Sequence, residues 1–111
     1  MNLRKEDLLR INEGFGGGLR SDSSLDFAFS VQESKRLGVY KKLAHLLRAI
    51  LVDHPFTDGN KRTATFVSLA FAEENKKTVD NDVLSHQIVS IAKKNITNIR
   101  VIADRIKTAI K

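Results

Sequence analysis

Residues 39–74 read VYKKLAHLLRAILVDHPFTDGNKRTATFVSLAFAEE, and this stretch decides the fold. From Val39 to Asp53, apolar residues recur at the 3.6-residue spacing of an amphipathic helix. Pro55 disfavours helical torsions at His54, so this helix is expected to end just before the histidine. A second helix is expected from about Lys61 to Glu74, and it is apolar on nearly every side, as a central helix is. The stretch therefore predicts two central helices joined by a short loop.

Helical patterns continue outside this stretch, and no segment alternates in the way a β-strand would. The Gly14–Gly18 run lacks the Gly-Lys-Ser/Thr of a phosphate-binding loop, so it is expected to be a mobile connector. Residues 1–111 contain no interdomain linker and are predicted to form a single all-α domain, a compact helical bundle. The further helices are expected over Leu3 to Asn12, with Asn2 as cap and Gly14 as stop; over Ser24 to Val31; after a cap at Asp80 or Asn81, through Ala92; and after a cap at Thr97, through Ile106.

Composition restricts the chemistry. A chain of 111 residues supports one hydrophobic core, and 41% apolar residues with a single proline fit a helical protein. Cysteine is absent, so neither a disulfide, nor a thiol nucleophile, nor a cysteine-ligated zinc site is expected. The three histidines, His45, His54 and His86, do not have the spacing of zinc ligands.

The net charge of +6 and the pI of about 9.8 raise the question of nucleic-acid binding. The basic residues occur in scattered pairs among acidic ones, and aromatic residues that would stack on bases do not alternate with them. Nucleic acid is therefore not the expected partner, and an acidic protein explains the charge equally well. The charged N-terminal residues and uncharged runs of at most ten residues predict a cytoplasmic protein without a membrane span.

Residues 54–62, His-Pro-Phe-Thr-Asp-Gly-Asn-Lys-Arg, contain the groups needed to handle a phosphate. Histidine takes up a proton near neutral pH, so His54 is the candidate general base for an acceptor hydroxyl. Asp58 offers the hard carboxylate oxygen that Mg²⁺ prefers beside phosphates. Gly59 allows the backbone to approach a ligand closely, and Asn60 is a candidate cap for the helix that follows.

Lys61 and Arg62 lie in the first turn of that helix, where the helix dipole disfavours positive charge. Two cations at this position indicate that an anion binds there, in reach of the free N–H groups of the helix. Each feature also has an ordinary interpretation. A histidine before proline often ends a helix or packs, Asp-Gly-Asn is a common turn, and Lys-Arg is often only solvated. Phe56 is expected to turn inward and anchor the loop.

The stretch resembles the signature of the Fic/Doc family through six positions: His54, Phe56, Asp58, Gly59, Asn60 and Arg62. The Asn-Lys-Arg form is similar to the Doc branch, the toxins of toxin–antitoxin pairs. The resemblance implies a helical bundle whose active-site loop lies between two central helices. It also implies that His54 is the base, that Asp58 holds Mg²⁺, and that Gly59, Asn60 and Arg62 bind nucleotide phosphates. A flap within residues 20–36 would hold the target peptide.

Two departures from the AMP-transferring members of the family bear on the transferred group. Lys61 stands where those members have glycine, and Thr65 stands where they have a second arginine. In the Doc-like branch the lysine goes with a reversed ATP, which implies transfer of the γ-phosphate to a Ser or Thr hydroxyl of a protein. AMP transfer is the alternative. The family's built-in inhibitory segment is absent, so a separate antitoxin is the expected partner.

Two readings from other classes remain open. One is a binding module without catalytic activity that keeps the motif. The other is a metal-dependent phosphohydrolase using His54 and Asp58, a class that generally needs more histidine and aspartate ligands.

Overall fold

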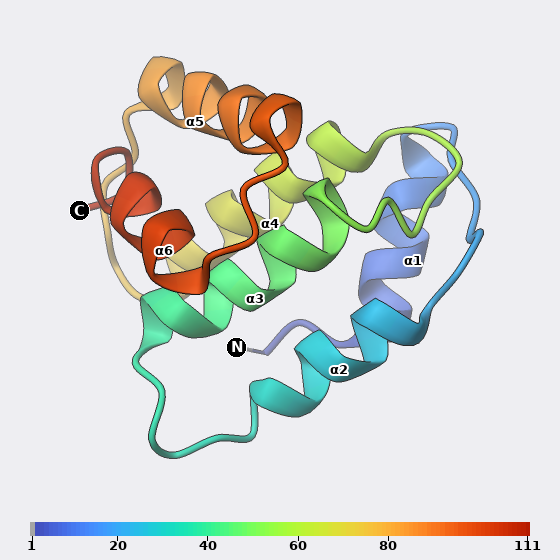
Figure 1. Ribbon diagram of the computed structural model, residues 1–111, viewed down its shortest axis with the longest axis horizontal. Helices are drawn as coiled ribbons and strands as arrows, with labels where there is room; N and C mark the ends of the chain where they lie inside the picture. Colours follow the sequence, from blue (N-terminus) through green and yellow to red (C-terminus); the bar gives the residue numbers. More distant parts are fainter. Residues whose placement is uncertain (1) are drawn as a thin grey trace.

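The computed structural model describes residues 2–111, and over these residues it forms six α-helices and no β-strand (Figure 1). The all-α fold expected from the sequence is therefore confirmed. Among these helices none is both long and apolar enough to cross a membrane. The helices are α1 (Lys5–Gly14), α2 (Ser23–Val31), α3 (Val39–Leu51), α4 (Asn60–Glu74), α5 (Asn81–Lys94) and α6 (Ile99–Lys107).

Helix α3 is the centre of the bundle. It contacts α2, α4, α5 and α6, and α4 in turn contacts α1 and α5. Figure 1 shows α1 and α2 on one side of the α3–α4 pair and α5 and α6 on the other. The apolar stripe expected in α3 contributes more residues to the core than any other helix, because it is covered from several directions. Its buried residues are Leu43, Ala44, Leu46, Leu47, Ala49, Ile50 and Leu51.

Helix α4 is less enclosed than its sequence suggests. Val67 and Phe71 are buried as expected, whereas Phe66 is 43% exposed and Leu69 is 39% exposed. The prediction of a helix apolar and covered on nearly every side is wrong in this respect. Helices α1, α3 and α5 cover α4, and no helix covers the side that carries Phe66 and Leu69.

Several helix ends differ from the expected ones by one or two residues. Helix α1 begins at Lys5, so its N-cap is Arg4 and not Asn2, whose N–H donates to a carboxylate oxygen of Glu74 in α4 at 2.6 Å. Asp80 caps α5 as expected, accepting the Val83 N–H at 3.1 Å. The cap of α6 is Asn98 rather than Thr97. Both residue types cap well, so the sequence alone did not distinguish two adjacent candidates.

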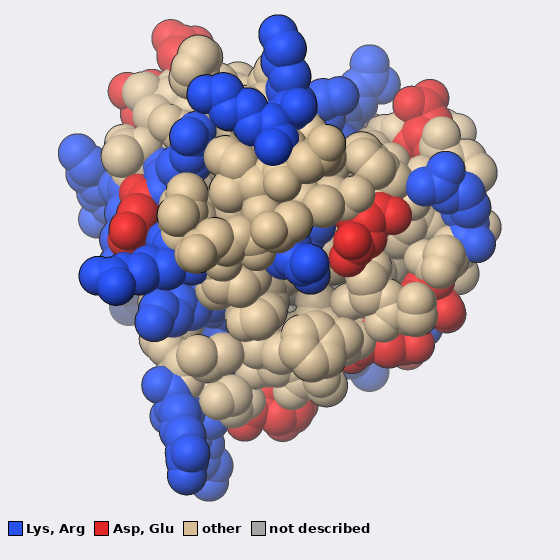
Figure 2. Space-filling view, viewed as in Figure 1, with Lys and Arg blue, Asp and Glu red and all other residues tan. Residues whose placement is uncertain are grey.

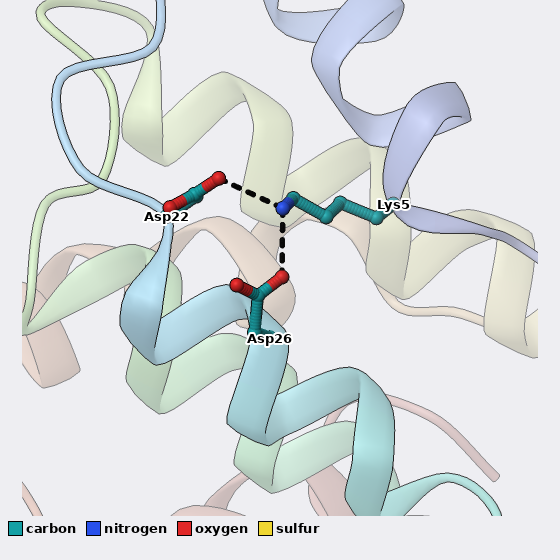
Figure 3. A network of polar contacts seen from close by, with 3 residues as sticks. All are labelled: Lys5, Asp22 and Asp26. Atoms are coloured by element: carbon teal, nitrogen blue, oxygen red, sulfur yellow. Dashed lines mark hydrogen bonds and ion pairs between the residues drawn. The ribbon is translucent and has the colours of Figure 1, made fainter.

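Lys5 joins α1 to the start of α2 (Figure 3). Its Nζ lies 2.8 Å from an oxygen of Asp22 and 2.7 Å from an oxygen of Asp26, as the close-up shows. The two carboxylates raise the pKa of Lys5 far above its usual range, and hydrogen bonding to Lys5 lowers the pKa of Asp22. These contacts link the first turn of α1 to the first turn of α2.

Basic side chains form separate groups on the face seen in Figure 2, with acidic side chains between them. This distribution matches the scattered pairs of lysines in the sequence. Lys77 and Lys107 each place Nζ over the Tyr40 ring, 5.2 Å and 5.4 Å from its centre.

Candidate active site

The segment that joins α3 to α4 covers residues 52–59 and contains two left-handed backbone positions. His54 has a φ of 49° and Gly59 a φ of 74°. Left-handed torsions are uncommon for residues other than glycine, so the conformation of His54 is one that its surroundings must hold. The right-handed helical region is avoided at His54, as expected for the residue before Pro55, and α3 ends at Leu51.

Phe56 turns into the core and is 1% exposed, the orientation expected from the sequence. Asn60 holds the main chain of the same residue from both sides. Its Oδ1 accepts the Phe56 N–H at 3.3 Å, and its Nδ2 donates to the Phe56 carbonyl at 3.0 Å. Asn60 is therefore the first residue of α4 and not its cap, which corrects the prediction. The N-cap is Gly59, because the asparagine amide is already engaged with the loop.

The N-terminus of α4 has no side-chain cap and no acidic residue in its first turn. It carries Lys61 and Arg62 instead, both exposed. Free N–H groups at a helix start, together with two cations, favour an anion. The anion site expected from the sequence stays a prediction at this helix start, where Asn60 is not the cap.

These residues surround one cavity of about 280 Å³. His54 and Asp58 line it from the loop, and the first turn of α4 lines the adjoining wall. Of the three histidines, only His54 lines it; His45 packs edge-on against Phe27, where burial lowers its pKa below the usual value. All of the predicted catalytic, metal and phosphate residues are brought together here. The complete lining is Leu51, His54, Thr57, Asp58, Gly59, Asn60, Lys61, Arg62 and Ala92.

Asp58 is exposed and has one carboxylate oxygen engaged, since Oδ1 accepts the Gly59 N–H at 2.8 Å. Within residues 2–111 no group of three histidine, cysteine, aspartate or glutamate side chains forms a metal cage. Mg²⁺ does not require one, because it is commonly held by a single carboxylate together with substrate phosphates and water. The Asp58 carboxylate therefore fits Mg²⁺ that would bind together with a nucleotide.

The glycine-containing segment 14–18 lies directly against the loop of residues 52–59, which we call the catalytic loop because it carries the candidate base His54. Two hydrogen bonds join Gly18 to Thr57. The Thr57 N–H donates to the Gly18 carbonyl at 2.9 Å, and the Gly18 N–H donates to the side-chain oxygen Oγ1 of Thr57 at 3.1 Å. Leu19 and Phe56 form an isolated antiparallel bridge. Residues 14–18 are thus more than the simple connector expected: Gly18 is bonded to the loop, and the N–H groups of Phe15, Gly16 and Gly17 donate to carbonyls in the last turn of α1.

Arg20 extends this contact to the candidate base. Its N–H donates to the Pro55 carbonyl at 2.7 Å, and its Nη2 donates to the His54 carbonyl at 2.6 Å. These bonds hold the main chain on both sides of the His54–Pro55 peptide. The sequence analysis included Arg20 only as the first residue of the range expected to contain the flap, and it assigned Arg20 no role beside His54.

In a comparison with protein families, the family described as the Fic/DOC family matches residues 3–72. This range covers α1 to α3, most of α4 and every predicted site residue. The search of curated proteins and the search of solved structures gave no match.

Proposed function

The chain belongs to the Fic/DOC family, whose members are generally transferases that modify proteins with a group from a nucleotide, and on this premise we propose that it transfers the γ-phosphate of ATP to a Ser or Thr hydroxyl of a target protein. The observation that carries the proposal is the position of Lys61. It lines the same cavity as His54 and Asp58, in the uncapped first turn of α4.

In the proposed reaction, His54 takes the proton from the target hydroxyl as its oxygen forms a bond to the γ-phosphorus. The bond between that phosphorus and the oxygen bridging to the β-phosphate breaks, and ADP leaves. Lys61, Arg62 and the N–H groups at the start of α4 would hold the phosphates. Mg²⁺ held at Asp58 would offset the negative charge that the phosphates bring.

AMP transfer is the alternative, and the environment of Thr65 argues against it. The AMP-transferring pattern requires a second arginine at this position. Thr65 provides no charge, and its hydroxyl donates to the Lys61 carbonyl at 2.9 Å within the helix. A hydroxyl turned back to its own helix offers nothing to a phosphate. The remaining positive charge lies at Lys61 and Arg62, which line the cavity together with His54, and this charge supports the reversed nucleotide.

A target peptide would reach His54 from the side of α2. A hollow of about 720 Å³ lies there and includes Asp53, the residue before His54, together with Phe27, which is 59% exposed. Residues 20–36, expected to contain a flap, consist largely of α2. An exposed aromatic side chain in this hollow is suited to contact a protein substrate.

The transferred group is read directly with labelled ATP. A cell lysate is incubated with Mg²⁺, the protein and ATP labelled at either the α- or the γ-phosphate. Label from γ-labelled ATP alone, absent with His54→Ala, supports the proposed kinase. Label from α-labelled ATP alone refutes it in favour of AMP transfer, and label in neither case favours the binding module.

We also propose that the protein is a Doc-like toxin controlled by a separate antitoxin. The support is the net charge of +6, which suits an acidic partner, and the Asn60-Lys61-Arg62 form of the motif, which is similar to the Doc branch. Expression of the wild-type protein should slow growth, whereas expression of His54→Ala should not. Normal growth with an active, abundant protein would refute the toxin assignment.

A further inference from the structure

Asn12 is a polar residue of α1 that is fully buried beside the catalytic loop. Its Nδ2 donates to the Asp58 carbonyl at 2.8 Å and to Thr63 Oγ1 at 3.1 Å. The residue is 0% exposed, as is Thr63. Asn12 therefore connects α1 to both the Asp58–Gly59 turn and the first turns of α4. The Asp58–Gly59 turn and the first turn of α4 both contribute residues to the lining of the cavity.

The orientation of the Asn12 amide follows from its partners. The Asp58 carbonyl is only an acceptor, so the atom facing it must be the nitrogen. Asn12 Oδ1 then faces Gly17, where it is buried and has no hydrogen-bond partner among residues 2–111. A buried acceptor without a partner is unfavourable, and an apolar side chain of similar size would avoid it. An apolar residue could not, however, donate the hydrogen bonds that Asn12 Nδ2 makes to the Asp58 carbonyl and to Thr63 Oγ1.

Two glycines allow the amide to lie where it does. A Cβ added at Gly17 would overlap Asn12 Oδ1 and the Asp58 carbonyl oxygen, and one added at Gly59 would lie 3.2 Å from Asn12 Nδ2. The Gly17 N–H also donates to the Asn12 carbonyl at 3.1 Å. The side chain of Asn12 is thus enclosed between the glycine-containing segment and the Asp58–Gly59 turn, with little room to rotate.

We propose that Asn12 is a positioning residue for the catalytic loop: its buried amide fixes the main chain of Asp58 and Gly59 and so aims the Asp58 carboxylate into the cavity. What that carboxylate then does rests on the function proposed above. Asn12 does not reach the cavity itself, which it does not line. It acts through the Asp58 carbonyl, and the Gly59 N–H completes the turn by donating to Asp58 Oδ1.

The test compares two substitutions of Asn12 with a matched control. Asn12→Asp keeps the shape and removes the donors, and Asn12→Ala removes the amide without adding a charge. Thr63→Val is the control, because it removes the second acceptor of Asn12 and leaves the bond to Asp58. Amide hydrogen exchange of Gly59, measured by NMR, reports on the turn without requiring activity. Transfer assays give kcat and the KM for ATP per folded molecule.

In the Asn12 variants, Gly59 should exchange roughly tenfold faster and kcat should fall by about 10²-fold, with a smaller change in KM. Thr63→Val should lose stability but keep Gly59 exchange and kcat near the wild-type values. Unchanged Gly59 exchange in a folded Asn12 variant overturns the proposal, as does an equal effect of Thr63→Val. If wild-type protein transfers nothing, the proposed function fails, and the Gly59 amide still decides the role of Asn12.

Discussion

A methyl group at Gly17 would test whether the glycine-containing segment fixes the catalytic loop. The added Cβ would overlap the Asp58 carbonyl oxygen and Asn12 Oδ1, and it would lie 2.8 Å from Asn12 Cγ. None of these atoms is the end of a flexible side chain: one is backbone, and the amide is held by its bonds to Asp58 and Thr63. Gly17→Ala must therefore push the two segments apart.

The size of the effect follows from the overlap. Non-bonded carbon and oxygen atoms separate to well above 3 Å, so the Asp58 main chain must move by on the order of 1 Å. Overpacking of this kind costs about 1–3 kcal/mol of folding free energy. A displacement of about 1 Å at a catalytic group costs about 10²-fold in rate. The rate should thus fall much more than the folded fraction does.

Gly18→Ala is the matched control, because its added Cβ would have only Thr57 Oγ1 nearby, at 3.9 Å. Neither glycine has a left-handed φ, so alanine is not excluded by its torsions at either position. Both variants are assayed for transfer rate per folded molecule and for the urea midpoint. If Gly17→Ala keeps the wild-type rate, or if Gly18→Ala loses as much, the segment does not set the geometry of the loop.

Three further predictions concern stability. Phe56→Ala should lower the free energy of unfolding by about 3–5 kcal/mol, because the side chain is 1% exposed, and Phe66→Ala should cost clearly less in the same urea titration. Lys5→Met should destabilise the protein slightly, since Lys5 pairs with two carboxylates at the surface, and the difference in urea midpoint should shrink as salt is added; a salt-independent difference would contradict this. Burial lowers the pKa of His45, so as the pH falls the unfolded chain takes up a proton at this residue before the folded protein does, and stability should decrease below about pH 6.5. His45→Gln should flatten the pH dependence of the urea midpoint, and an unchanged slope would contradict this role of His45.

The fold and the composition of the site were predictable because they depend on local patterns. The helical period of α3 and the break at Pro55 are properties of adjacent residues, and they place the loop between two packed helices. The motif from His54 to Arg62 is contiguous, so one loop necessarily brings its side chains together. Chemistry carried by neighbouring residues can be recognised without the structure.

The support of the loop was not predictable, because it comes from residues about 35 to 45 positions away. Asn12 appears in the sequence as an ordinary polar residue at the end of α1, and Gly17 as one of several glycines. Their roles arise from a close contact between backbone segments, which leaves no periodic pattern. Asn60 was misassigned for a related reason: its amide suits a cap and equally suits the bonds to Phe56 that it makes.

The exposed side of α4 shows a different limit. Hydrophobicity at Phe66 and Leu69 predicted burial, but three helices cover only part of the surface of a fourth. In a chain of this size, apolar residues often remain at the surface. The pattern of a helix indicates which side is apolar, whereas the number of neighbouring helices decides how much of that side is covered.

The mass added to a purified target protein tests the central claim most directly. The labelled protein from the lysate is isolated, treated with wild-type protein or His54→Ala in the presence of Mg²⁺ and ATP, and its intact mass is measured. The account predicts that the wild type adds the mass of one phosphate and that His54→Ala adds it at least about 10²-fold more slowly. Addition of one AMP instead of one phosphate, or an equal rate with His54→Ala, would contradict it.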